Sequence, residues 1–325
     1  MERNRFNEEI ADRLGGTIGG ILRRAVPQMP SLPANITEIR IRAGQPLSLH
    51  FIKGTSFLTH NGTSALEKQA YRVTMQDIHE TIQHVCQHSR YAYSQDIRNG
   101  FITVPGGHRI GLAGRMIHDG SLTEISSMTV RVAREIKEAG KKVFPYILRD
   151  NQDIYSTLII SPPGCGKTTL LRDLARKMSN GDTNHFFTGL NVGIVDERSE
   201  IAACYRGVPS NDLGIRTDVY DGCPKDKGIL MMLRSMAPNV IVTDELGGEK
   251  DMDAVLSAMN GGVRILATAH GYGIKDNALR PDIARIVNAC LFERYIVLSR
   301  REGAGTLEGV YGFYKEKIYE RSVDL

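Results

Sequence analysis

A run of small residues, prolines and glycines ends in a lysine and two threonines. Its members are Ser161, Pro162, Pro163, Gly164, Cys165, Gly166, Lys167, Thr168 and Thr169. Glycines at 164 and 166 let backbone N–H groups come close to phosphate oxygens. The amine of Lys167 can reach the β- and γ-phosphates, and the hydroxyl of Thr168 can ligate Mg²⁺. The pattern therefore predicts a phosphate-binding loop of the Walker A type, with ATP and Mg²⁺ as its ligands.

One position of this loop departs from the pattern G-x-x-x-x-G-K-[ST], because Ser161 stands where the first glycine is expected. That position ends a strand and does not wrap the phosphate, so a small residue can replace glycine there. The apolar residues 158–160 precede the loop and helix-forming sequence follows it. The loop thus opens at a helix N-terminus, whose dipole favours an anion. The alternative is a chance glycine-rich turn.

A second acidic motif follows a buried β-branched run at residues 239–243. The run ends in Asp244 and Glu245, which is a Walker B pattern. We expect Asp244 to hold the metal, directly or through water, and Glu245 to polarise the attacking water. One apolar run with an acid is weak evidence by itself. Its occurrence downstream of a phosphate-binding loop strengthens the prediction.

Two further polar groups lie at predicted strand ends. The strand at 191–195 runs into an acidic stretch from Asp196 to Glu200, and acids at the carboxyl end of a parallel strand lie on the ligand side of a sheet. The alternative there is an acidic helix start. The strand at 263–268 runs into His270, which could sense the γ-phosphate or could be an ordinary packing residue.

The elements that carry these residues alternate between strand and helix from about residue 141 onward. This order calls for a mainly parallel sheet with right-handed crossovers, as in the RecA-like P-loop NTPases. We therefore expect an α/β fold, with a P-loop ATPase domain at 141–325 and a smaller α+β domain at 1–140. A hairpin is expected to join 291–298 to 306–311, and the chain from Lys315 onward is expected to be a solvated tail.

The N-terminal part begins with a helical pattern over Asn7–Ala25, interrupted by glycines. It is expected to dock on its own domain, or alternatively to act as an adaptor for a partner or membrane. A linker is expected at Pro27–Pro33, and a hairpin with a Pro-Gly-Gly turn at 100–115. Strand-borne arginines are expected to be solvated or to face a nucleotide: Arg109, Arg115, Arg131 and Arg134.

Composition narrows the class of protein. The chain has 325 residues, of which 41% are hydrophobic and 24% charged, and its net charge is +4. This mild basicity is less than a nucleic-acid reader usually concentrates. The five cysteines are scattered without C-x-x-C spacing, which favours a reducing compartment over a disulfide framework or zinc site. No apolar run approaches the length of a membrane span, so a cytoplasmic location is expected, including one against a membrane.

Together these residues resemble the type II/IV secretion and pilus-retraction ATPases. The closer resemblance is to the stage III sporulation AA branch of these ATPases, found in endospore-forming bacteria. It rests on five stretches: residues 38–42, 161–168, 196–200, 237–248 and 267–271. Residues 196–200 fall where the superfamily carries its Asp box, and His270 where it carries its His box. Asp244 replaces a glycine of the usual Gly-Glu pair, which leaves open whether Asp244, Glu245 or Glu200 handles the water.

The resemblance implies a homo-oligomeric ring, with six subunits suspected, and nucleotide between the two domains and at subunit edges. It also implies a motor that energises assembly or transport through the channel between mother cell and forespore. A membrane-anchored channel protein would be its partner. Neither spacing nor composition indicates these points.

Two other functions fit the same motifs. One is a RecA-like ATPase that handles nucleic acid, although no aromatic-rich basic stripe supports it. The other is an assembly scaffold that binds ATP and hardly hydrolyses it. An arginine from a neighbouring subunit or from the N-terminal domain is expected to stabilise transition-state charge in the motor.

Overall fold

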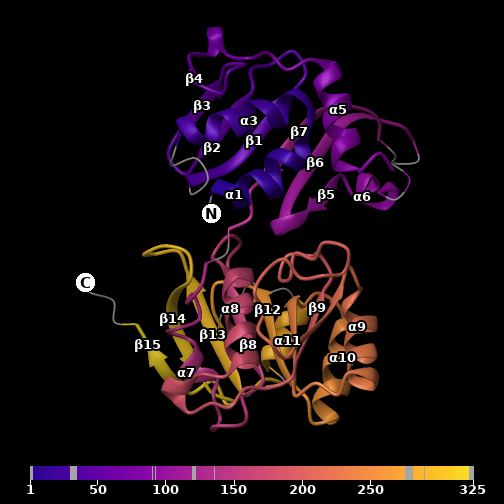
Figure 1. Ribbon diagram of the computed structural model, residues 1–325. Coiled ribbons are helices and arrows are strands. Elements are labelled where there is room, and N and C mark those ends of the chain that lie inside the picture. Colours follow the sequence, from indigo (N-terminus) through magenta and orange to yellow (C-terminus); the bar gives the residue numbers. More distant parts are fainter. Residues whose placement is uncertain are drawn as a thin grey trace. The chain divides into compact units, whose positions relative to one another are not determined.

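The computed structural model describes residues 3–29, 35–89, 91, 93–118, 122–134, 136–274, 281–288 and 290–321. The chain divides into two compact units (Figure 1). Unit 1 comprises Met1–Arg134 together with Ala203–Ser210, and unit 2 comprises Glu135–Ala202 together with Asn211–Leu325. The domain boundary expected between residues 140 and 141 stays a prediction.

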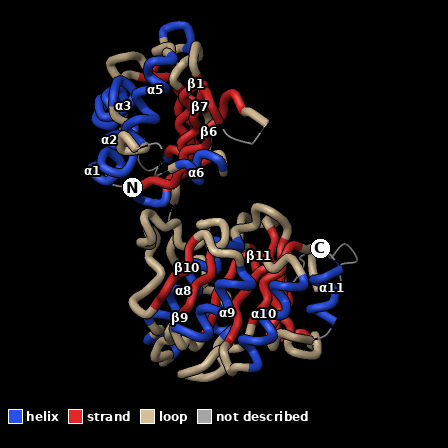
Figure 2. Tube along the Cα trace, turned by 90° about the vertical axis from the view of Figure 1, so that its right-hand side faces the viewer, coloured by secondary structure: helices blue, strands red, loops and turns tan. Residues whose placement is uncertain are grey.

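Unit 1 is an antiparallel sheet with helices on one side (Figure 2). Its strand order is β4-β3-β2-β1-β7-β6-β5, and every pair is antiparallel. The strands are β1 (Ile36–Arg42), β2 (Ser48–Phe51), β3 (Thr55–Leu58), β4 (Ser64–Ala65), β5 (Phe101–Val104), β6 (His108–Met116) and β7 (Leu122–Arg131). The helices are α1 (Arg3–Phe6), α2 (Asp12–Leu14), α3 (Gly16–Gln28), α5 (Met75–Val85) and α6 (Ser94–Arg98). The hairpin predicted at 100–115 is confirmed by the pairing of β5 with β6.

The N-terminal helical segment docks on the core of its own unit. Its apolar side chains are all at most 1% exposed: Ile10, Leu14, Ile18, Ile21 and Leu22. The segment is not one helix, because Gly15 has φ +56° and separates α2 from α3. Residue Pro27 lies inside α3, so the expected start of a linker there is wrong, and residues 30–34 lie outside the described part.

A short segment from between two strands of unit 2 belongs to unit 1. In Ala203–Ser210, the hydroxyl of Tyr205 accepts a hydrogen bond from Gln87 Nε2 at 2.6 Å. Arg206 Nη2 donates to Gln87 Oε1 at 2.5 Å, and the guanidinium of Arg13 lies 6.0 Å from the ring centre of Tyr205. Nothing in the sequence pattern predicts that Ala203–Ser210 belongs to unit 1.

Unit 2 is built on an eight-stranded sheet in the order β10-β9-β11-β12-β8-β13-β14-β15. The six strands from β10 to β13 in this order are parallel, and the last two are antiparallel. They are β8 (Thr157–Ser161), β9 (Val192–Asp196), β10 (Thr217–Asp221), β11 (Val240–Glu245), β12 (Arg264–His270), β13 (Arg294–Ser299), β14 (Thr306–Tyr311) and β15 (Lys317–Glu320). The mainly parallel sheet and the 291–311 hairpin are confirmed. Because Lys317–Glu320 pairs with β14, the expectation of a solvated tail from Lys315 is wrong.

Helices cover both faces of this sheet. They are α7 (Phe144–Ile147), α8 (Lys167–Asn180), α9 (Lys225–Ser235), α10 (Glu249–Asn260) and α11 (Pro281–Asn288). Apolar residues of α9, α10 and α11 share one core with side chains from β8, β9 and β11–β13. Helix α8 lies outside that core and packs against β9–β12 (Figure 1). The connection from β8 to β9 runs toward the β10 edge of the sheet, whereas those from β10 to β11, β11 to β12 and β12 to β13 run the other way. Right-handed crossovers in opposite directions place their helices on opposite faces of a sheet.

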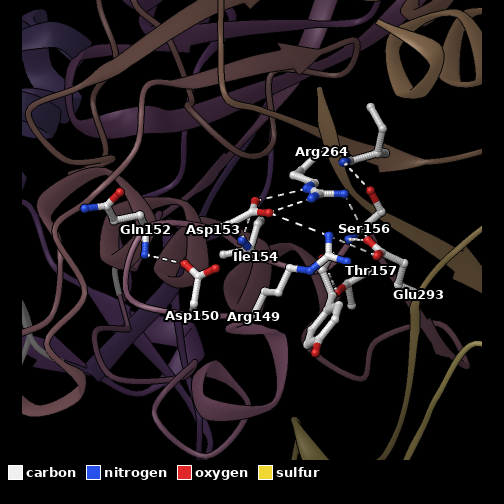
Figure 3. Close-up of polar contacts among 11 residues, drawn as sticks. Arg149, Asp150, Gln152, Asp153, Ile154, Ser156, Thr157, Arg264 and Glu293 are labelled. Atoms are coloured by element: carbon white, nitrogen blue, oxygen red, sulfur yellow. Dashed lines mark hydrogen bonds and ion pairs between the residues drawn. The ribbon is translucent and has the colours of Figure 1, made fainter. Parts of the chain in front are cut away.

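A network of charged side chains ties together the amino ends of the central strands (Figure 3). Arg264, at the start of β12, makes a two-armed contact with Asp153 at 2.5 and 3.0 Å. The same guanidinium lies 3.3 Å from Glu293, which also accepts from the backbone N–H of Ser156 at 3.0 Å. Planar two-armed pairs of this kind fix geometry as well as charge. The network therefore stabilises the edge of the sheet away from the phosphate-binding loop.

Within the part of the chain that the structure describes, no helix is both long enough and apolar enough to cross a membrane. None of the five cysteines, all of which lie in the described ranges, forms a disulfide bond.

Candidate functional site

The loop between β8 and α8 has the backbone of an anion-binding turn. Gly164 and Gly166 have φ values of +70° and +83°, a region that a side chain makes unfavourable. Within the described ranges, no backbone carbonyl accepts from the N–H groups of Gly164, Cys165 or Gly166. Helix α8 begins at Lys167, so its positive dipole end points out of the same turn. Unpaired amides and a helix N-terminus together suit a phosphate group.

Lys167 joins the loop to the neighbouring strand. Its Nζ donates to the carbonyl oxygens of Ser161 and Pro162 at 2.9 and 3.2 Å, and lies 3.0 Å from Nδ1 of His270. Strand β12 pairs with β8 so that His270 stands opposite Ser161. Burial lowers the pKa of the Lys167 amine, while the carboxylate of Glu245 opposes this. His270 therefore lies at the end of the strand next to β8, as the sequence predicts.

The imidazole of His270 links Lys167 to Glu245. Its Nε2 lies 2.9 Å from Oε2 of Glu245, the last residue of β11. An ammonium group can only donate, so Nδ1 of His270 must accept from Lys167. The other ring nitrogen, Nε2, then faces the carboxylate of Glu245. Three of the residues expected to be catalytic are thus in polar contact with one another at the carboxyl edge of the sheet.

Asp196 organises a turn rather than facing a ligand. It is fully buried, and its carboxylate accepts from the backbone N–H groups of Glu200, Ile201 and Ala202 at 2.8–2.9 Å. Burial raises its pKa to about 6, although these backbone hydrogen bonds lower it. The alternative of a helix start is wrong, because residues 197–200 form a turn.

Arg172 of α8 holds the same turn from the phosphate-binding side. Its Nη2 and Nε donate to the carbonyl oxygens of Glu200 and Ile201 at 2.7 and 2.8 Å. The backbone of Glu200 is therefore fixed from two directions, by Asp196 and by the first helix of the site. The role of Glu200 as the base stays a prediction. Arg172 was not anticipated, since a lone arginine in a helix carries no pattern.

Asp244 forms an ion pair with Lys225, a residue that the motifs do not predict. Its Oδ1 lies 2.8 Å from Nζ of Lys225, the first residue of α9, and Lys225 also contacts Glu197. The two partners are 8% and 5% exposed. This is an ion pair without directed hydrogen-bond geometry, because Oδ1 has no partner of that geometry among the described residues. Burial raises the pKa of Asp244, and Lys225 offsets part of this rise.

Among the described residues, no group of three or more His, Cys, Asp or Glu side chains is arranged to hold a metal ion by itself. Mg²⁺ is commonly bound by one or two carboxylates together with substrate phosphates. Asp244 offers a hard oxygen without a directed hydrogen bond, and Thr168 lies in the first turn of α8. These donors fit a nucleotide-linked Mg²⁺, and their roles stay predictions.

The turn between β13 and β14 closes against the phosphate-binding loop. The N–H of Gly305 donates to the carbonyl oxygen of Cys165 at 2.8 Å, and a side chain on Gly166 would lie 3.5 Å from Cβ of Ala304. A cavity of about 370 Å³ borders this turn, lined among others by Tyr146 and Tyr319, whose ring centres are 5.6 Å apart. Small-molecule sites occupy volumes of about 300–1,000 Å³.

A model of the family described as "Sporulation stage III, protein AA" matches residues 4–318. The chain belongs to this family. A relative in Bacillus subtilis (strain 168), named stage III sporulation protein AA, is 39% identical over 307 residues, which are 93% of this chain and 94% of that protein. The resemblance to this family expected from the motifs is confirmed.

Two solved structures have the same fold. They are the ATPase DotB of Legionella pneumophila and the pilus retraction motor PilT with bound ADP, each with a TM-score of 0.55 and 14% identity. The alignments cover 90% of this chain and 80% of DotB, and 92% of this chain and 83% of PilT. At this identity the likeness concerns the fold, and it confirms the RecA-like architecture preceded by an α+β part.

Proposed function

We propose that this member of the family is an Mg²⁺-dependent ATPase whose turnover drives assembly or transport through the channel between mother cell and forespore. The observation that carries the proposal is the series of polar contacts from Lys167 through His270 to Glu245, beside the glycine-rich loop that precedes α8. A scaffold that only bound nucleotide would have no need to link the phosphate lysine to a carboxylate. ATP is the substrate, and phosphate and ADP are the products.

Each residue of the site has one part in this reaction. The amides of residues 164–168 and the amine of Lys167 bind the phosphates, and His270 holds Glu245 in place. Glu245 orients the attacking water and accepts its proton. Thr168 and Asp244 would hold Mg²⁺, which spreads the charge that develops on the phosphate oxygens. The backbone-anchored Glu200 remains the alternative base.

The cavity beside the phosphate-binding loop would take the nucleoside. Tyr146 and Tyr319 offer an aromatic surface for a base, next to the turn that contacts Cys165. Tyr146→Ala should therefore weaken ATP binding and leave the binding of inorganic tripolyphosphate unchanged. Tyr146→Phe keeps the ring and serves as the control. Equal weakening of both ligands by Tyr146→Ala would contradict this assignment.

The assembly is also a proposal. The family resemblance supports a homo-oligomeric ring, with six subunits suspected, and a membrane-anchored channel protein as partner. The chain would act in the cytoplasm, at the membrane through that partner. An arginine finger from a neighbouring copy or from the N-terminal part would complete the transition-state site, and such fingers contribute about 10³–10⁵ in rate.

The test is phosphate release from ATP by the purified full chain with Mg²⁺, measured together with ADP binding. Lys167→Ala should abolish binding. Glu245→Gln should bind ADP with unchanged affinity and lose about 10²-fold or more in turnover. Glu249→Gln, the same change at an exposed residue that begins α10, should behave as wild type.

Two outcomes would favour the other functions. If Glu245→Gln supports sporulation in cells as well as wild type, the protein is a nucleotide-gated scaffold. If single-stranded DNA or RNA stimulates turnover and salt removes the stimulation, it is a nucleic-acid-handling ATPase.

A further inference from the structure

Lys225 is a buried lysine that contacts Asp244, the carboxylate expected to bind Mg²⁺. Lys225 is 5% exposed, lies 2.8 Å from Asp244 Oδ1 and also contacts Glu197, whose side chain is 42% exposed. The oxygen it approaches has no directed hydrogen bond among the described residues. The position beside Asp244 is therefore taken by a cation of the chain itself.

The packing of α9 on β9 brings this lysine into place. A side chain on Gly228 would lie 2.5 Å from Cγ1 of Val195, and one on Gly193 would lie 2.7 Å from Cγ of Met232. Two glycines thus let the helix and the strand approach closely. Lys225 is the first residue of this helix, so the close packing directs its amine toward the end of β11.

The amine remains charged in this environment. Its Nζ contacts two carboxylates, those of Asp244 and Glu197. A buried ion pair is weak evidence for stability, because desolvation offsets the attraction. A role in the chemistry of the site explains its presence better than a contribution to folding does.

We propose that Lys225 is a positioning residue that holds Asp244 and competes with Mg²⁺ for its carboxylate. The inference rests on the proposed function. When Mg²⁺ and nucleotide bind, Asp244 exchanges its partner, and Lys225 keeps its contact with Glu197. Two like charges near one carboxylate repel each other, so Lys225 weakens the affinity of the site for the metal.

The experiment measures ADP binding to the full chain at pH 8 across a range of Mg²⁺ concentrations. Lys225→Met should lower the Mg²⁺ concentration at which ADP binding is half-maximal by about tenfold or more. Lys225→Gln keeps a hydrogen-bond donor but not the charge, and it should lower this Mg²⁺ concentration as well. It serves as the test if Lys225→Met does not fold. Lys227→Met removes the same charge from an exposed position two residues away and should leave it unchanged.

A second readout needs no nucleotide. Mg²⁺ alone should raise the melting temperature of Lys225→Met or Lys225→Gln, because the metal replaces the missing cation at Asp244. It should not raise the melting temperature of wild type or of Lys227→Met.

The possible results separate the two proposals. If wild type binds ADP with Mg²⁺ dependence and both Lys225 variants follow Lys227→Met, the competition is disproved while the ATPase proposal stands. A rise in the Mg²⁺ requirement of the Lys225 variants would also overturn it. If wild type binds no ADP at any Mg²⁺ concentration, the proposed function fails and this inference fails with it.

Discussion

Nε2 of His270 lies 2.9 Å from Oε2 of Glu245, across two adjacent parallel strands of the unit 2 sheet. The other ring nitrogen accepts from Lys167, which fixes the proton of the ring on the side of Glu245. The contact with His270 holds the carboxylate of Glu245 on the side of the glycine-rich loop that contains Lys167.

Replacing this histidine should reduce turnover more than binding. We expect His270→Ala to lower kcat by about 10²-fold while ADP affinity changes little, because the phosphate contacts come from the loop. His270→Gln can retain one donor and should recover part of the rate. Steady-state kinetics with isothermal titration check both effects. A large loss of ADP affinity with unchanged kcat would show that His270 serves binding instead.

Stability should depend on pH through Asp196. Its pKa of about 6 in the folded chain exceeds the ordinary value of 3.8, so the unfolded chain loses this proton first as pH rises. The contribution of Asp196 to stability therefore falls between about pH 4 and pH 6, by on the order of 3 kcal/mol. Wild type should lose about that much relative to Asp196→Asn from pH 4 to pH 7 in urea unfolding. If the free energies of unfolding of wild type and Asp196→Asn change equally with pH, Asp196 does not cause this pH dependence.

The charged network at the opposite edge of the sheet should affect stability alone. Burial would raise the pKa of Asp153, but hydrogen bonds from Arg264 and from the N–H of Ile154 lower it. Asp153→Asn should cost about 1–3 kcal/mol at pH 7. The difference in the free energy of unfolding between wild type and Asp153→Asn should persist at pH values above the ordinary carboxyl pKa. It should vanish as the pH falls through the lowered pKa of Asp153.

ADP affinity is the second measurement for this variant and should not change. Asp150→Asn alters the same loop outside the Arg264 contact and should cost less (Figure 3). Equal losses for the two variants would argue against a specific contribution of the Arg264 contact.

Gly228 should tolerate no side chain. A methyl group there would lie 2.5 Å from Cγ1 of the buried Val195, and overpacking of this kind costs about 1–3 kcal/mol. Gly228→Ala should therefore lower the unfolding midpoint and also disturb the Mg²⁺ dependence, because the helix carries Lys225. Gly248→Ala is the control, since nothing lies within 4 Å of its added methyl group. Equal midpoints would show that the helix can shift without cost.

Local patterns were enough to predict the strands at whose ends the candidate residues lie. The β-branched runs before Ser161 and Asp244, and the strand that leads to His270, are central parallel strands buried on both faces. Their acids and lysine meet because parallel strands share one carboxyl edge. The alternation of strands and helices added the expectation that these strands belong to one mainly parallel sheet.

Contacts between distant segments could not be predicted in the same way. No motif marks Lys225, the first residue of α9, as the partner of Asp244. Pro224 before it and Asp226 after it are the only local signals that a helix begins there. Strand β10 has no buried residues, and β15 reads as a charged tail. Both are recognised only by their pairing with a neighbouring strand.

The eight residues Ala203–Ser210 have a practical consequence for dissecting this protein. They follow directly on the turn that Asp196 closes, yet they pack with the first 134 residues. A fragment that stops near residue 140 would lack part of its own packed interior. Neither unit is a single continuous stretch of the chain, so neither can be expressed whole as one simple fragment. Proteolytic cleavage within Ala203–Ser210 would break the peptide link between Glu200 and this segment of unit 1.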